Sequence, residues 1–167
     1  MATQQCLVLI KPDGLVKSLT GNIITKLAET NLKIVGSKIV SVKRDFAEKH
    51  YNKLKEEQIA KHGVEKGTQI YEGTLKYIMG DYHTNRVMAL VYEGEDAIAK
   101  IRQIAGATNP EKAEPTSIRG KYGRINSSTG VFENVMHASE NAEHAEREIK
   151  LWFKPGELVS HVFGSKW

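Results

Sequence analysis

The sequence predicts a single α/β domain, because short apolar runs of strand length alternate with segments of helical periodicity. The clearest strands are Cys6–Ile10 and Val87–Tyr92, and the clearest helices follow at 23–28 and 98–105. With 167 residues, of which 40% are hydrophobic, the chain can bury one full core but not two ordinary ones. We therefore expect residues 1–167 to form one domain.

Composition narrows the class of protein. The formal charge is +4, but lysines alternate with glutamates, so small anionic ligands fit this pattern better than a nucleic-acid stripe. Cys6 is the one cysteine, which excludes an internal disulfide. No apolar run approaches the ~20 residues of a membrane span, and the first residues resemble no targeting signal. We expect a cytoplasmic protein without a membrane partner.

The first strand sets the position of a lysine. Cys6–Ile10 is apolar throughout, as in a strand covered on both faces, and Lys11-Pro12-Asp13-Gly14 predicts a turn directly after it. The Lys11 ammonium is thus held at the end of a central strand, where it can reach a phosphate or a sugar hydroxyl. A surface lysine that merely closes the strand is the alternative.

The next elements continue the alternation. Residues 23–28 are expected to form a helix with Thr20 as N-cap, and Leu32–Val42 a partly exposed strand. Asp45 is the predicted cap of a helix on which Tyr51 either packs or faces a site. The charged, glycine-containing stretch 56–67 predicts a surface excursion, and 70–79 a short helix.

The second half contains two candidate phosphate ligands. Arg102 lies at the flank of the helix 98–105, which Gly106 closes, where it either complements the helix dipole or faces a ligand. The segment 108–120 predicts an irregular binding loop, in which Arg119 presents its planar guanidinium beside Gly120. Residues 122–133 predict a small hairpin-like arm.

A histidine and a glutamate complete the pattern. Val135 and Met136 predict the end of a short buried strand and 141–152 a helix, so His137 is expected at the corner between them. At roughly 100° per residue, Glu148 falls at the edge of the apolar stripe of that helix. A half-inward carboxylate there can orient the imidazole and stabilise its cation.

The usual nucleotide and zinc signatures are missing from the sequence. It contains no GxxxxGK[ST] loop, no GxGxxG after a strand, no CxxC and no HExxH. A protein of this sequence that handles nucleotides must hold their phosphates with side chains.

Five ordered motifs, spread over nearly the whole chain, resemble the nucleoside diphosphate kinase family. They are Ile10-Lys11-Pro12-Asp13-Gly14, Thr108-Asn109-Pro110, Ile118-Arg119-Gly120, Asn134-Val135-Met136-His137-Ala138-Ser139, and Ala145-Glu146-Arg147-Glu148-Ile149 with Leu151-Trp152-Phe153-Lys154-Pro155.

The resemblance implies a ferredoxin-like antiparallel four-stranded sheet with helices on one face, together with peripheral helices and a hairpin-like insertion. It implies a phosphotransferase in which His137 takes the terminal phosphoryl group of a nucleoside triphosphate and passes it to a nucleoside diphosphate, by a ping-pong mechanism with broad base specificity. Mg²⁺ would be bound mainly through the nucleotide phosphates, and the protein would be a homo-oligomer, a tetramer or hexamer.

The resemblance also assigns roles to residues. Glu148 would orient His137, Ser139 would steady Glu148, and Lys11 and Asn134 would bind the sugar hydroxyl and nearby phosphates. The phosphate chain would be held by Arg102, Thr108 and Arg119, with Tyr51 close to the transferring group. Ile70 or Tyr71 would contact the base. Ala138 and Glu140 replace the family's usual glycine and aspartate.

Two other functions remain open from the sequence. A basic ferredoxin-like sheet is also the RRM architecture, and Arg119–Gly123 resembles the start of an RNP1 motif, but aromatic residues total only 7%. A metal-dependent hydrolase could use His137, His144 and Glu148. His144, however, is expected to point away from the inward face of its helix.

Overall fold

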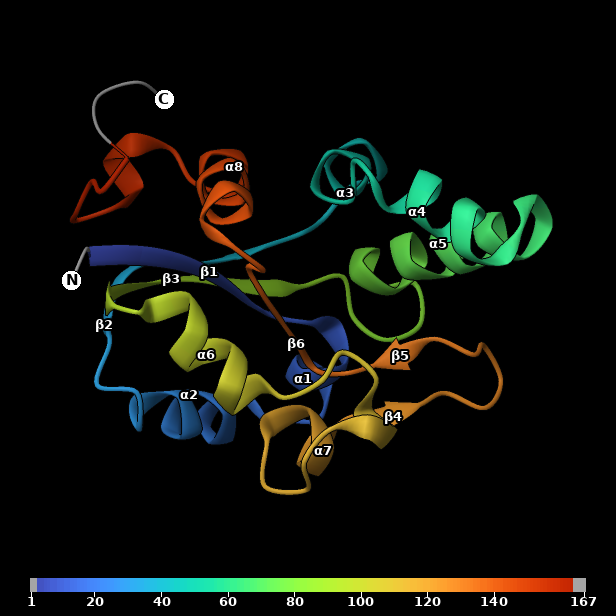
Figure 1. The fold of residues 1–167 in the computed structure, drawn as a ribbon, viewed down its shortest axis with the longest axis horizontal. Coiled ribbons are helices and arrows are strands. Elements are labelled where there is room, and N and C mark those ends of the chain that lie inside the picture. Colours follow the sequence, from blue (N-terminus) through green and yellow to red (C-terminus); the bar gives the residue numbers. More distant parts are fainter. Residues whose placement is uncertain (1–2, 164–167) are drawn as a thin grey trace.

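Four strands form one antiparallel sheet in the order β2-β3-β1-β6 in the computed structural model, which describes residues 3–163 (Figure 1). The strands are β1 (Thr3–Ile10), β2 (Lys33–Val40), β3 (Val87–Glu95) and β6 (Met136–Ala138). The central strand β1 pairs with β3 and β6, and Cys6 to Ile10 are fully buried. The predicted ferredoxin-like fold is confirmed.

Helices cover both faces of this sheet, and they divide the core into two layers (Figure 1). On one face lie α2 (Thr20–Ala28) and α6 (Ala97–Ala105), and on the other lie the peripheral helices α3 (Arg44–His50), α5 (Val64–Met79) and α8 (Ala142–Trp152). Alternate residues of β1 face opposite layers. Because His137 lies opposite Leu9, its side chain faces the α8 layer.

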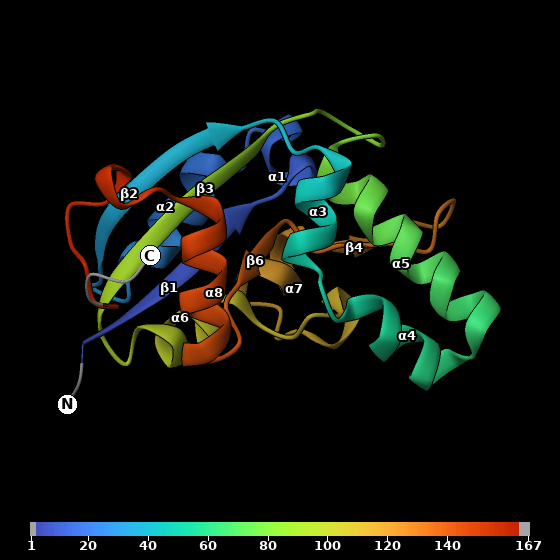
Figure 2. The same ribbon diagram turned by 90° about the horizontal axis from the view of Figure 1, so that it is seen from above.

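One region differs from the sequence-based expectation. The stretch 56–67, predicted as a surface excursion, belongs to α4 (Leu54–His62) and the first turn of α5, which pack as a helical hairpin beside the sheet (Figure 2). α4 buries none of its residues, so it carries no apolar periodicity from which a helix could be predicted. Gly63, with φ +83°, joins the two helices, and Gly67 allows their close approach.

Smaller corrections concern the ends of elements. Lys11–Gly14 begins a short helix, α1 (Pro12–Val16), instead of a simple turn, with its proline in the first turn. Thr20 is the first residue of α2 and not its cap, and Asp45 lies inside the first turn of α3. The predicted binding loop contains η1 (Pro110–Lys112) and α7 (Ile118–Tyr122). Another short helix, η2 (Pro155–Glu157), follows α8, and no helix within residues 3–163 is long and apolar enough to cross a membrane.

The predicted hairpin arm is present and is fixed at its base by a buried carboxylate. The arm consists of β4 (Arg124–Ile125) and β5 (Phe132–Glu133). Glu133 accepts hydrogen bonds from Arg124 Nε (2.6 Å) and Asn126 Nδ2 (2.9 Å), and its Oε1 lies 2.6 Å from His83 Nε2. Burial would raise the pKa of Glu133, but the hydrogen bonds from Asn126, Arg124 and His83 outweigh it and lower that pKa to about 2.

A strained turn connects this arm to β6. Met136 N donates to Asn134 O at 2.7 Å, and Val135 between them has φ +60°. A left-handed conformation is unfavourable for a β-branched residue, so its surroundings must hold it. The buried Asp13 carboxylate does so, since it accepts Val135 N–H at 3.2 Å and the Tyr77 hydroxyl at 2.6 Å.

We expect Asp13→Asn to lower the free energy of unfolding by about 1–3 kcal/mol, because an amide cannot accept both hydrogen bonds and leaves a buried donor unsatisfied. Urea denaturation at pH 7 measures the change. Asp45→Asn is the matched control, since Asp45 is exposed, and should change stability by less than about 0.5 kcal/mol. Equal stability of the two variants would contradict the holding role of Asp13.

We expect the hairpin arm to lose stability in acid, because Glu133 becomes protonated. Because its pKa is depressed in the folded state, its stabilisation is complete above the ordinary glutamate pKa of about 4.3 and is lost as the pH falls toward 2. Urea midpoints between pH 7 and pH 2.5 should fall less steeply for Glu133→Gln than for the wild-type protein. Glu143→Gln, at an exposed position, should keep the wild-type slope.

Candidate active site

His137 lies in the middle of β6, and not at the strand-to-helix corner that the sequence predicts. Its Nε2 is 3.1 Å from Glu148 Oε2, and Ser139 Oγ donates to the same oxygen at 2.6 Å. Leu7 N–H in turn donates to Ser139 Oγ at 3.1 Å, which ties this chain of contacts to the central strand. An ionised carboxylate only accepts, so Nε2 of a neutral His137 carries the proton and Nδ1 keeps its lone pair.

Glu148 is ionised at neutral pH although it is buried. Burial would raise its pKa, but the electrostatic interaction and hydrogen bond with His137, the electrostatic interaction with His50 and the hydrogen bond from Ser139 lower it to about 2. α8 places this carboxylate at the edge of its buried face, as the sequence predicts. The site therefore holds a fixed negative charge beside the imidazole, which stabilises positive charge on the ring.

Lys11 is buried beside the strained turn. Its Nζ donates to Asn134 Oδ1 at 2.9 Å and lies 5.0 Å from the centre of the Tyr77 ring. Burial, and then the charge of Arg119, lower the pKa of Lys11 to about 7. Asn134 Nδ2 donates to the carbonyl of the exposed Thr108 at 2.9 Å, so Asn134 joins Lys11 to the predicted binding loop.

Arg119 is fixed by two backbone carbonyls. Its terminal nitrogens donate to Gly106 O at 2.8 Å and to Met136 O at 3.2 Å, immediately before His137. Burial and the charge of Arg102 lower its pKa to about 10, so the two guanidinium groups lie within electrostatic range. Arg119 Nε is buried and finds no hydrogen-bond partner in the described part of the chain. Positive charge therefore accumulates next to the imidazole.

Tyr51 lies beside the same centre, at the end of α3. The centroids of the Tyr51 and His50 rings are 4.6 Å apart, and those of the His50 and His137 rings are 4.9 Å apart. Burial raises the pKa of Tyr51, and so does the Glu148 charge. The phenol therefore remains protonated and can donate a hydrogen bond at neutral pH.

The two residues expected at the base lie apart from this cluster. Tyr71 is 8% exposed and packs in the core layer under α5, with Lys55 Nζ 5.9 Å from its ring centre. Ile70 is half-buried on the same helix, and its carbonyl accepts from the Thr74 hydroxyl. Neither makes a contact with the histidine cluster among the interactions of the described residues.

Four residues of this centre were not predicted from the sequence: Asp13, His50, Tyr77 and Trp152. His50 and Trp152 lie on apolar helix stripes, and this pattern alone indicates core packing. Asp13 belongs to the motif that begins with Lys11, but its partners are 64 and 122 residues away in the chain. Only the folded chain brings them together.

The structure bears on both alternative functions. His144 Nδ1 lies 3.7 Å from Glu140, on the outer part of α8, so His144 does not join His137 and Glu148 in a metal site. Arg119 and Gly120 lie in the helix α7, whereas RNP1 aromatics are presented on a strand.

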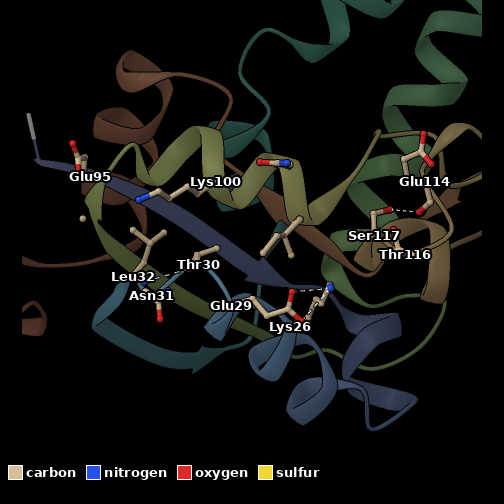
Figure 3. A pocket seen from close by; sticks show the side chains of 13 residues that line it. Lys26, Glu29, Thr30, Asn31, Leu32, Glu95, Lys100, Glu114, Thr116 and Ser117 are labelled. Carbon is tan, nitrogen blue, oxygen red and sulfur yellow. Dashed lines mark hydrogen bonds and ion pairs between the residues drawn. The ribbon is translucent and has the colours of Figure 1, made fainter. Parts of the chain in front are cut away.

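An open groove of about 790 Å³ elsewhere on the molecule is not this site (Figure 3). Lysines and glutamates from α2, α6 and the segment 114–117 mix along it, and Lys26 is paired with Glu29 at 2.8 Å. None of the predicted site residues lines this groove. With two lysines and three glutamates in its lining, the groove offers no preference for a phosphate chain.

Comparison with known proteins agrees with the geometry. The family model described as nucleoside diphosphate kinase matches residues 4–158. A nucleoside diphosphate kinase of Thermococcus kodakarensis is 40% identical over 98% of this chain and 84% of its own length. The Borrelia burgdorferi enzyme, solved as a transition-state mimic with vanadate and ADP, has a TM-score of 0.82 at 31% identity, covering 96% of this chain and 93% of its own.

The Halobacterium salinarum enzyme in complex with CDP has a TM-score of 0.75 at 34% identity, covering 95% of this chain and 92% of its own. This chain therefore belongs to the nucleoside diphosphate kinase family, and it transfers phosphoryl groups between nucleoside triphosphates and nucleoside diphosphates.

Proposed function

We propose that His137 carries the transferred group as a phosphohistidine in a ping-pong cycle. The Nδ1 lone pair attacks the terminal phosphorus of a nucleoside triphosphate, the bond to the bridging oxygen breaks, and the nucleoside diphosphate leaves with that electron pair. A terminal oxygen of a second diphosphate then attacks the phosphorus and returns the pair to Nδ1. The observation that carries this proposal is the contact of His137 Nε2 with Glu148, which leaves Nδ1 free.

Glu148 and Ser139 act on the ring and not on the nucleotide. When Nδ1 takes the phosphoryl group, the imidazole becomes cationic, and the adjacent carboxylate stabilises that charge. The Ser139 hydroxyl, held by Leu7 N–H, keeps the carboxylate oxygen in place. His137 is thus oriented before any substrate binds.

The nucleotide is held by groups from distant parts of the chain. Lys11 and Asn134 bind the sugar hydroxyl and the phosphates near it, and Arg102, Thr108 and Arg119 hold the phosphate chain, with Tyr51 donating to the transferring group. The unpartnered Nε of Arg119 supports this role, since a phosphate oxygen would satisfy it.

Base specificity is broad on this proposal, because sugar and phosphate contacts carry no information about the base. Relatives of similar fold have been solved with an adenine and with a cytosine nucleotide. Ile70 or Tyr71 on α5 contacts the base, and the burial of Tyr71 makes the half-buried Ile70 the more accessible of the two.

Mg²⁺ enters with the nucleotide. In such sites it takes oxygen ligands, often one or two carboxylates with phosphates and water, but Glu148 is already used by His137 and Ser139, and Asp13 by Tyr77 and Val135. The protein residues therefore fit a metal ion bound mainly through phosphate oxygens, and the ion supplies charge neutralisation when it is bound.

The proposal also covers the oligomeric state, the domain organisation and the cellular compartment of the protein. A homo-oligomer, a tetramer or hexamer, is supported by β2, which within residues 3–163 pairs only with β3 and exposes Ile34 and Ile39. The described residues form one domain, residues 1–2 and 164–167 lying outside them, and the protein works in the cytoplasm.

Incubation with γ-labelled ATP should label the protein, because the phosphoryl group becomes bonded to nitrogen. The label should be lost in acid, survive base and move to added nucleoside diphosphate. His137→Ala should carry no label, whereas His144→Ala, changed on the outer part of α8, should be labelled like the wild-type protein. Full labelling of His137→Ala would exclude this nucleophile.

Nucleotide affinity should weaken as pH rises through 7. Lys11 has a free-enzyme pKa of about 7, and only its protonated form attracts phosphate, so binding favours the low-pH side. Calorimetric dissociation constants for ADP between pH 6 and pH 9 test this. Lys11→Met should bind more weakly and lose the inflection, whereas Lys112→Met, at an exposed position in η1, should keep it.

A further inference from the structure

A second histidine stands next to His137, and its tautomer is fixed by the fold. His50, the last residue of α3, is 3% exposed, and its Nδ1 accepts a hydrogen bond from Trp152 Nε1 at 3.1 Å. An indole N–H can only donate, so Nδ1 of His50 must keep its lone pair. Burial, and then the electrostatic interaction with the neighbouring His137, lower the pKa of His50 well below its ordinary value, so the ring is neutral. The one proton of that neutral ring therefore resides on Nε2.

That Nε2–H group is buried without a hydrogen-bond partner in the chain from residue 3 to residue 163. Almost all buried polar groups are paired, and an exception indicates strain or a function. This arrangement is unfavourable for stability, because it buries an unpaired donor. It also uses the only side-chain donor of Trp152 to orient the His50 ring.

The position of the ring indicates what would accept the hydrogen bond. The rings of His50 and His137 meet edge to face, at an interplanar angle of 79° and a centroid distance of 4.9 Å. One nitrogen of each ring and one oxygen of Glu148 all lie within 4.8 Å of one another. His50 therefore lies directly beside the ring that carries the phosphoryl group in the proposed cycle.

A metal ion is the other ligand that two histidines and a carboxylate could hold. A metal needs the lone pair of a ring nitrogen, however, and Trp152 already occupies the lone pair on Nδ1 of His50. The remaining nitrogen presents a proton. The geometry therefore favours an anionic acceptor over a cation.

We propose that His50 is a further catalytic residue, whose Nε2–H donates to an oxygen of the phosphoryl group carried by His137. This inference rests on the phosphohistidine proposed above. A neutral donor suits the position, because a cation at that distance would oppose the positive charge that the His137 ring develops on phosphorylation. Trp152 acts as a positioning residue, since it places the proton on Nε2.

NMR spectroscopy of the wild-type protein tests the tautomer of His50 directly. Long-range ¹H–¹⁵N correlation spectra at pH 7 should show His50 with a proton on Nε2 and an unprotonated Nδ1, and this pattern should be lost in Trp152→Phe. A proton on Nδ1 of wild-type His50 would overturn the inference. Loss of the Nε2 proton on addition of Zn²⁺ alone would also overturn it, in favour of a metal site.

Single-turnover kinetics test the catalytic role. His50→Phe keeps an aromatic ring but removes the donor, and should slow both phosphorylation by ATP and dephosphorylation by ADP by roughly 10²-fold, the usual effect of removing one such donor. The dissociation constant of ADP should not change. His50→Gln, which restores an N–H, should recover most of the rate.

Transfer by His50→Phe at the wild-type rate, or a slower rate explained entirely by weaker ADP binding, would contradict the role of His50. This failure is distinct from failure of the phosphohistidine itself, because in the latter case the wild-type protein would also remain unlabelled.

Discussion

One buried carboxylate holds the geometry of the whole site. Asp13 links the first helical turn after β1 to the Tyr77 hydroxyl on α5 and to the backbone of Val135 before β6. Together with the hydrogen bond from Lys11 N–H to Val135 O at 2.9 Å, that link holds Val135 in its left-handed conformation. The turn it stabilises directs Asn134 toward Lys11 and starts β6 in the register that turns His137 toward α8.

The charged side chains of this centre are held in place before a substrate binds, and this preorganisation suits phosphoryl transfer. The positive groups Lys11 and Arg119 are held partly dehydrated, and Glu148 is ionised beside His137. These charges are unfavourable in the free protein, as the lowered pKa values of both cations show. A polyanionic ligand makes the charged forms of Lys11 and Arg119 favourable, because its negative charge neutralises theirs. In the proposed mechanism, transfer then proceeds among dipoles that need little reorganisation.

Sequence patterns predicted those parts whose cause is local. Continuous apolar runs identified β1 and β3, and helical spacing placed Glu148 at the inner edge of α8. α4 was missed because a helix with no buried face has no period, and the turn at Val135 because its strain is imposed by Asp13 from elsewhere. His50 was not predicted as a site residue, since no sequence pattern reveals that Trp152 fixes its tautomer.

The anchoring of the hairpin arm separates two regions that are adjacent in the chain. Glu133 fixes the base of the arm, while residues 127–130 at the tip are exposed. The tip is connected to this base through Asn126, which accepts from Ser128 N and Thr129 N and donates to Glu133. The exposure of the tip makes it a natural attachment point for a fluorophore or affinity peptide in an engineered form of the enzyme.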